Sequence, residues 1–122
     1  MQGKPEAAIP LCRKAVQELE RKMGRTNRDN NIMAFLLNLL AIIYQEQGRF
    51  EESIGFLRET LEIREMVFGL KHSVVASTLN KISVLYGKCG DFKTAEPISR
   101  RALEIKQEVR QASSNRVVLV IT

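Results

Sequence analysis

The chain repeats part of its own sequence at a spacing of 42 residues. When residues 37–69 are shifted forward by 42, they fall on residues 79–111, and ten of the 33 positions are identical. The start of the chain matches at an offset of 45, because three extra residues fall in the polar stretch 25–31. A repeat of this length is typical of units that bury their apolar faces only by stacking on their neighbours. The sequence therefore predicts a stack of similar units.

The apolar residues inside the repeat have helical spacing. Leu37, Leu40, Ala41 and Tyr44 follow the i, i+3, i+4, i+7 pattern of one helix face, and the second copy repeats it. Glycines recur where the helices should end, as left-handed C-caps favour. The connections are short, so neighbouring helices should pack antiparallel. These patterns predict an all-α fold of antiparallel helix pairs, with about five helices over residues 5–23, 29–47, 50–68, 73–88 and 92–110.

The end of the chain departs from the repeat. We expect a repeat domain over residues 1–111, made of the second helix of one unit and two whole units, followed by a divergent flexible tail over 112–122. Residues 117–121 are consecutive apolar residues, most of them β-branched, which is an aggregation-prone pattern. The tail is therefore predicted to be poorly ordered or to pair between chains. Alternatively, it folds back over apolar surface of the last helix.

Composition argues against several classes of protein. One histidine allows no paired-histidine metal site, and no GxGxxG or P-loop spacing is present, so neither an enzyme nor a cofactor is expected. The longest apolar run falls short of the roughly 20 residues that cross a bilayer, and the first residues lack an apolar signal segment. Cys12 and Cys89 cannot form a disulfide framework. Together these features predict a cytoplasmic protein without a membrane span.

The net charge of +5 raises nucleic acid, anionic membranes and acidic peptides as partners. The charges are interspersed, as on the solvated face of a helix. Proteins that bind single-stranded nucleic acid usually place aromatic side chains beside their basic groups, whereas the aromatics here fall on core stripes. No nucleic acid is therefore expected, although a nucleic-acid-binding helical repeat stays open as an alternative.

The small and aromatic residues of the repeat resemble the tetratricopeptide pattern, with Ala41 and Tyr44 before Gly48 and a second copy from Ser83. The longer unit resembles the repeats of kinesin light chains closely. The matching segments are residues 9–12, 37–44, 61–65, 85–88, 95–97 and 101–105. Two departures occur. The family's His-Pro pair is His72-Ser73 here, and the second asparagine of the family, expected directly after Asn38 and Asn80, is replaced by Leu39 in the first copy and by Lys81 in the second.

This resemblance implies a non-catalytic cargo adaptor for kinesin-1, associated with the cytoskeleton and microtubules. Kinesin light chains bind acidic and aromatic cargo motifs on their repeats, so cargo peptides or adaptor proteins are the implied partners. They join the kinesin heavy chain through a heptad region that is absent from this sequence. Two other possibilities stay open, namely a tetratricopeptide scaffold unrelated to motors and a truncated remnant without function.

The stripe beside the core face is the candidate peptide-binding surface. An asparagine amide can both donate and accept, so Asn38 and Asn80 are candidates to hold an extended peptide backbone. Alternatively, both asparagines only satisfy neighbouring backbone groups. Lysines and arginines nearby are candidates for acidic side chains. The complete candidate set is Asn38, Ile42, Gln45, Asn80, Lys81, Val84, Lys88, Arg64 and Arg101.

Overall fold

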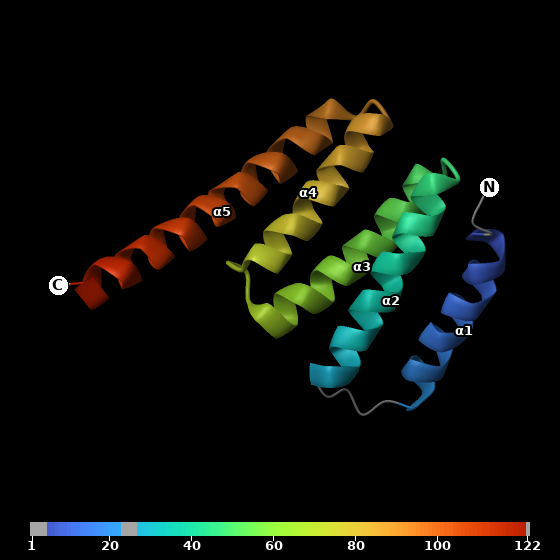
Figure 1. Cartoon of the computed structure of the whole chain (residues 1–122). Coiled ribbons are helices and arrows are strands. Elements are labelled where there is room, and N and C mark those ends of the chain that lie inside the picture. The colour runs from blue at the N-terminus through green and yellow to red at the C-terminus, as the bar shows by residue number, and fades with distance from the viewer. Residues whose placement is uncertain (1–4, 23–26, 122) are drawn as a thin grey trace.

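A computed structural model describes residues 5–22 and 27–121. It contains five helices, α1 (Pro5–Lys22), α2 (Asn27–Glu46), α3 (Phe50–Phe68), α4 (Ser73–Lys88) and α5 (Phe92–Ile121), and no strand within those ranges. Each helix packs on the next one in the chain, so the helices form a row from α1 to α5 (Figure 1). The expected all-α architecture is confirmed. Helices α3 and α4 have the expected bounds, and α1 and α2 differ from them by at most two residues.

The turns after α2 and α4 are copies of each other. Gly48 and Gly90 have φ angles of 78° and 82°, a left-handed region that favours glycine. The Arg49 amide donates to the Tyr44 carbonyl and the Gly48 amide to the Gln45 carbonyl, at 2.9 and 3.0 Å. The equivalent bonds after α4 have the same lengths. This double bond is the Schellman helix ending. It confirms the predicted caps at these two glycines, whereas Gly24 lies outside the described residues.

Within each helix pair, one buried serine joins the two helices. Ser53 Oγ donates to the Ala41 carbonyl at 2.6 Å, and Ser83 Oγ donates to the Ala95 carbonyl at 2.9 Å. In the 42-residue repeat, Ser83 is equivalent to Ala41, and Ala95 is equivalent to Ser53. The same bond is thus present in both units, but the serine lies on the second helix of the first pair and on the first helix of the second pair. Small side chains at both positions let the helices approach closely enough to form it.

Helix α5 is longer than expected. It continues past residue 110 to Ile121, so the expected flexible tail over 112–121 is helical backbone instead. No glycine or proline follows Pro97, and residues such as Gln111 and Ala112 favour helix, so nothing in this stretch ends the helix. The prolines Pro10 and Pro97 lie inside α1 and α5, as the pattern requires. Over the described residues, no helix is both long and apolar enough to cross a bilayer.

The N-terminus of α4 is capped by the single histidine. The Val74 amide donates to Nδ1 of His72 at 3.1 Å, and the His72 ring lies 4.7 Å from the Phe68 ring, measured between centroids. His72 is thereby placed in the capping and packing role that its position before a helix predicts. The contact with Phe68 also joins the end of α3 to the start of α4.

We predict that His72→Ala lowers the free energy of unfolding by about 1 kcal/mol, because it removes this cap and leaves the Val74 amide without its acceptor. His72→Asn keeps a side-chain acceptor at the cap and should recover a large part of the loss. Urea unfolding of the three proteins, followed by circular dichroism, measures both effects. Equal midpoints for the alanine variant and the parent would contradict the capping role.

Candidate functional site

The candidate residues of α2 and α4 form one surface, which we call the α2–α4 face and define as Asn38, Ile42, Gln45, Asn80, Lys81, Val84 and Lys88. Their spacing along each helix places them on one side of it. Lys81 Nζ donates to Asn38 Oδ1 at 3.3 Å, a contact between residues 43 positions apart. The long side chain of Lys81 thus bridges α4 and α2 at this face, although the two helices do not pack directly on each other. Ile42 and Val84 are exposed there, at 41% and 48% of their surface.

Arg64 extends to this face from α3. Its guanidinium donates to Thr78 Oγ1 at 2.7 Å, and Thr78 Oγ1 donates in turn to the Val74 carbonyl at 2.9 Å. Desolvation lowers the pKa of Arg64. Desolvation also lowers the pKa of Lys81, and the charge of Arg64 lowers it further. The half-buried Arg64 and the exposed Lys81 therefore lie near each other, and no carboxylate among the described residues forms an ion pair with either one.

The two asparagines are not used by the backbone in the described part of the chain. Asn38 is half-buried and accepts from Lys81, while Asn80 is exposed and has no hydrogen-bond partner among the described residues. The alternative that both asparagines satisfy nearby backbone groups thus finds no such bond in that part of the structure. Gln45 is half-buried, and Lys88 Nζ lies 5.8 Å from the centroid of the Phe50 ring. The amide groups of this face are available to a ligand.

Arg101 does not join the other candidates. Its guanidinium pairs with the carboxylate of Glu65 at 2.5 Å, which links α5 to α3. An arginine already paired with a glutamate has little excess charge to offer an acidic ligand. Among the described residues, the structure therefore assembles the α2–α4 face and Arg64 and leaves Arg101 in a structural ion pair.

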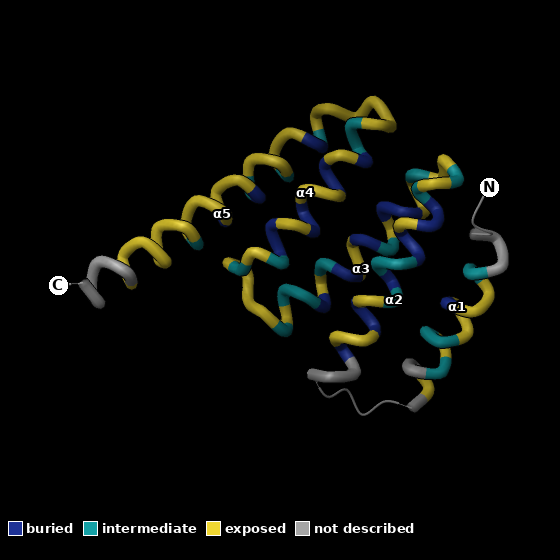
Figure 2. The backbone as a smooth tube through the Cα atoms, in the orientation of Figure 1, coloured by how far each residue is buried: buried dark blue, intermediate teal, exposed yellow. Residues whose placement is uncertain are grey.

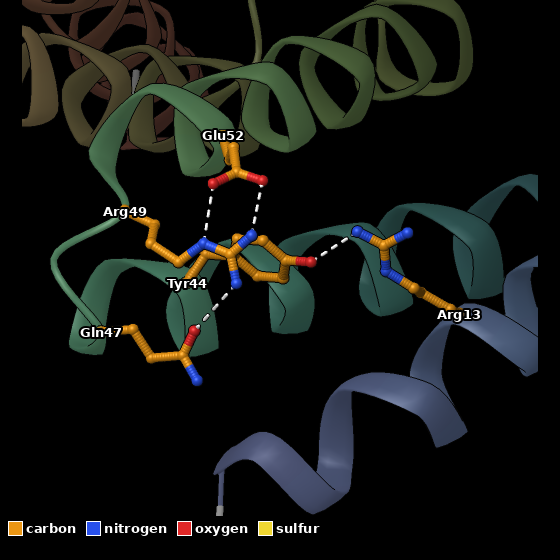
Figure 3. Close-up of polar contacts among 5 residues, drawn as sticks. All are labelled: Arg13, Tyr44, Gln47, Arg49 and Glu52. Carbon is orange, nitrogen blue, oxygen red and sulfur yellow. Dashed lines mark hydrogen bonds and ion pairs between the residues drawn. The ribbon is translucent and has the colours of Figure 1, made fainter.

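Sequence reasoning missed a cluster around Tyr44, a side chain that is only 1% exposed. Arg13 of α1 donates to the Tyr44 hydroxyl at 2.5 Å, and the Arg49 guanidinium lies over the ring, 4.3 Å from its centroid (Figure 3). Arg49 also donates to both carboxylate oxygens of Glu52, at 2.7 and 2.8 Å, and this bonding lowers the pKa of Glu52. The signal was present in the repeat, because Arg13 and Arg58 are equivalent, as are Tyr44 and Tyr86.

The same contact occurs in the second unit. Arg58 donates to the Tyr86 hydroxyl at 2.5 Å and lies 5.4 Å from the centroid of its ring. At the α1–α2 and α3–α4 junctions, an arginine of the earlier helix thus donates to a tyrosine of the later one. Among the described residues, no group of three or more histidine, cysteine, aspartate or glutamate side chains could hold a metal ion.

Comparison with known proteins agrees with this architecture. Residues 32–108 match the tetratricopeptide repeat family model. The crystal structure of BtubC (BKLC) from P. vanneervenii superposes with a TM-score of 0.72 at 23% identity, over 88% of this chain and 41% of that chain, so the likeness concerns the fold. No curated protein sequence matches the chain. Stacked helix pairs of this kind serve as protein-binding scaffolds. The match over most of the chain establishes that the protein belongs to the tetratricopeptide repeat family.

Proposed function

We propose that the chain binds short acidic peptides on the α2–α4 face, as a cargo-binding module of the kinesin light chain type. The observation that carries this proposal is the pair of neighbouring cations, the exposed Lys81 bonded to Asn38 and the half-buried Arg64 bonded to Thr78. Neither cation has an ion pair with a carboxylate among the described residues. A carboxylate from a ligand would supply the missing countercharge.

The electrostatics favour an anionic ligand. Two cations near each other repel, and desolvation penalises both charges. A peptide carboxylate between them would offset both penalties, and it would raise the pKa of Lys81 toward its ordinary value. The hydrogen bond from Lys81 to Asn38 is long, at 3.3 Å, so exchanging it for a carboxylate loses little.

The remainder of the face suits an extended peptide with an apolar side chain. Asn80 is exposed and can donate to and accept from one peptide unit. Ile42 and Val84 offer exposed apolar surface within the same face. A ligand with an acidic residue near a large apolar residue would use both features. This composition is also the one that the resemblance to kinesin light chains implies.

We expect Lys81→Ala to weaken binding of an acidic peptide by a few-fold and to flatten its salt dependence, since exposed charge pairs contribute about 0–1 kcal/mol each. Asn80→Ala should weaken binding more, by about 1–3 kcal/mol, if it leaves a peptide amide unpaired. Titrations at two salt concentrations, with an acidic peptide and its amidated neutral analogue, measure both effects.

Lys106→Ala serves as a matched control, because Lys106 is an exposed lysine on α5 outside the face. It should leave affinity and salt dependence near the parent values. Equal affinity of the parent, the Lys81 variant and the Asn80 variant for the acidic peptide, with unchanged melting, would refute the assignment of this face.

A further inference from the structure

The outer side of α5 carries a hollow that no described residue fills. Its volume is about 440 Å³ and its lining combines one residue of α4 with one stripe of α5, namely Ser83, Phe92, Ala95, Glu96, Ser99, Arg100 and Leu103. Figure 2 shows α5 as largely exposed along its length. Phe92 and Leu103 are 69% and 56% exposed, so apolar side chains at this hollow face solvent.

The equivalent residues of α1 and α3 each pack against the helix that follows them in the chain. On α3, residues Ile54, Leu57 and Leu61 form one cluster with Ile82, Leu85 and Tyr86 of α4. On α1, the equivalent residues contact Leu40, Ile43 and Tyr44 of α2 in the same way. In both cases the incoming helix presents apolar residues at i and i+3 and a tyrosine at i+4. We call the receiving stripe a helix seat.

The hollow is the third copy of this seat. Five residues of the filled seat are Ala41, Phe50, Ile54, Leu57 and Leu61. Their equivalents 42 residues later are Ser83, Phe92, Glu96, Ser99 and Leu103. All five of these residues line the hollow. A seat that is filled by the next helix at two junctions is therefore open at the third, as far as the described residues show.

The arginine of the seat is repeated as well. Arg13 and Arg58 each donate to a tyrosine hydroxyl of the incoming helix at 2.5 Å. Arg100 occupies the third equivalent position and lines the hollow. Its partner in this chain is Glu96, one turn earlier on the same exposed helix surface, at 2.5 Å. Such an exposed pair contributes little to stability, so the guanidinium can turn toward another acceptor.

We propose that the α5 hollow binds an amphipathic helix of a partner protein, one that presents a tyrosine to Arg100 and apolar residues one and four positions before that tyrosine. This ligand and this surface differ from those of the α2–α4 face. A second copy of the chain does not qualify as the occupant, because its only two tyrosines are Tyr44 and Tyr86, and both are held inside its own seats.

The polarity of the third seat favours a separate partner. Ile54 and Leu57 are buried in the filled seat of α3, whereas their equivalents are Glu96 and Ser99. A face that is covered permanently would bury the carboxylate of Glu96, and such burial is unfavourable. Interfaces of proteins that also exist apart are about as polar as the rest of the surface. The hollow combines this polarity with a shape already suited to a helix.

The test uses the helix that this type of seat is known to hold. The probe is a fluorescent peptide copying residues 73–88, cross-linked between positions 77 and 81, both of which are exposed in the fold. Binding is titrated with the full chain, with Arg100→Leu, and with Arg110→Leu as a control on the same helix outside the hollow. A second probe carries Tyr86→Phe and so lacks only the hydroxyl.

We expect Arg100→Leu to weaken the first probe about tenfold, as the loss of a hydrogen bond to a charged group does. The control should bind as the parent does. On the parent chain, the phenylalanine probe should bind more weakly than the first probe by the same factor. On the Arg100→Leu variant, the two probes should bind with equal affinity. Leu103→Asp, at an exposed position, should abolish binding while circular dichroism shows an unchanged fold.

Three results would overturn the proposal. The first is failure of the tyrosine probe to bind the parent chain. The second is a tenfold loss of affinity for the first probe with Arg58→Leu and no loss with Arg100→Leu, which would mean that the probe has replaced α4 in its own seat. The third is self-association of the parent without probe that Leu103→Asp abolishes, which would make a second copy the occupant.

Discussion

Tyr44→Ala should lower the free energy of unfolding by about 3–5 kcal/mol, the range for removing a large aromatic side chain from a core. Tyr44 is almost completely buried and lies at the junction of α1, α2 and α3. Its ring contacts the Phe56 ring edge to face, with the centroids 5.1 Å apart. The substitution would also leave the guanidinium of Arg13 without its acceptor and that of Arg49 without the ring beneath it. Chemical denaturation measures this loss.

Two comparisons separate the parts of this effect. Tyr44→Phe removes only the hydroxyl and should lower stability by much less than the alanine substitution. Tyr86→Ala changes the equivalent residue of the next unit, which is half-buried, so it should have a smaller effect than Tyr44→Ala. Equal losses for the two alanine variants would contradict the view that burial, and not the repeat position, sets the size of the effect.

The helices could be predicted from sequence because each depends on a local signal. The spacing of Leu37, Leu40 and Tyr44 fixes the buried face of α2, and Gly48 and Gly90 end α2 and α4 through a backbone conformation that glycine favours. The repeat then gave each signal a second time. Errors of one or two residues at the ends of α1 and α2 concern helix termini, where local signals are weakest.

The end of α5 could not be predicted in the same way. The run of β-branched residues after Arg116 has a propensity for strand, and propensity favoured a separate tail. Nucleation is the unfavourable step in helix formation. Once a helix has formed through Ala112, each added residue gains a hydrogen bond and only one further residue has to be ordered. No glycine or proline interrupts it. The absence of a stop signal therefore decided the outcome more than the propensity of the final residues.

The candidate site was predictable as a stripe but not as a set of contacts. Helical spacing placed Asn38 and Lys81 on their helices, yet their hydrogen bond depends on how α2 and α4 are positioned by α3, on which both pack, and no local pattern encodes this. The same holds for Arg64, which approaches Thr78 from α3, and for Arg101, whose pairing with Glu65 spans two helices. Side-chain partners across a stack follow from its superhelical geometry.

Leu85→Ala and the neighbouring Val84→Ala should separate stability from binding. Leu85 is 1% exposed and belongs to the cluster that joins α3 and α4, so its truncation should lower the free energy of unfolding by about 2–5 kcal/mol. Val84 is one residue earlier but points to solvent on the α2–α4 face. Its truncation should leave stability within about 0.5 kcal/mol of the parent, as is usual for surface positions.

The affinity for an acidic peptide with an apolar residue should show the reverse order. Val84→Ala removes apolar surface from the α2–α4 face and should lower the affinity for the peptide by a few-fold while the chain stays folded. Leu85→Ala should keep parental affinity at temperatures well below its lowered melting point, because Leu85 does not contribute to that face. Unfolding curves and peptide titrations of the same two preparations measure both orders. A Val84 variant with reduced stability and unchanged affinity would show that Val84 contributes to packing and is not part of a binding surface.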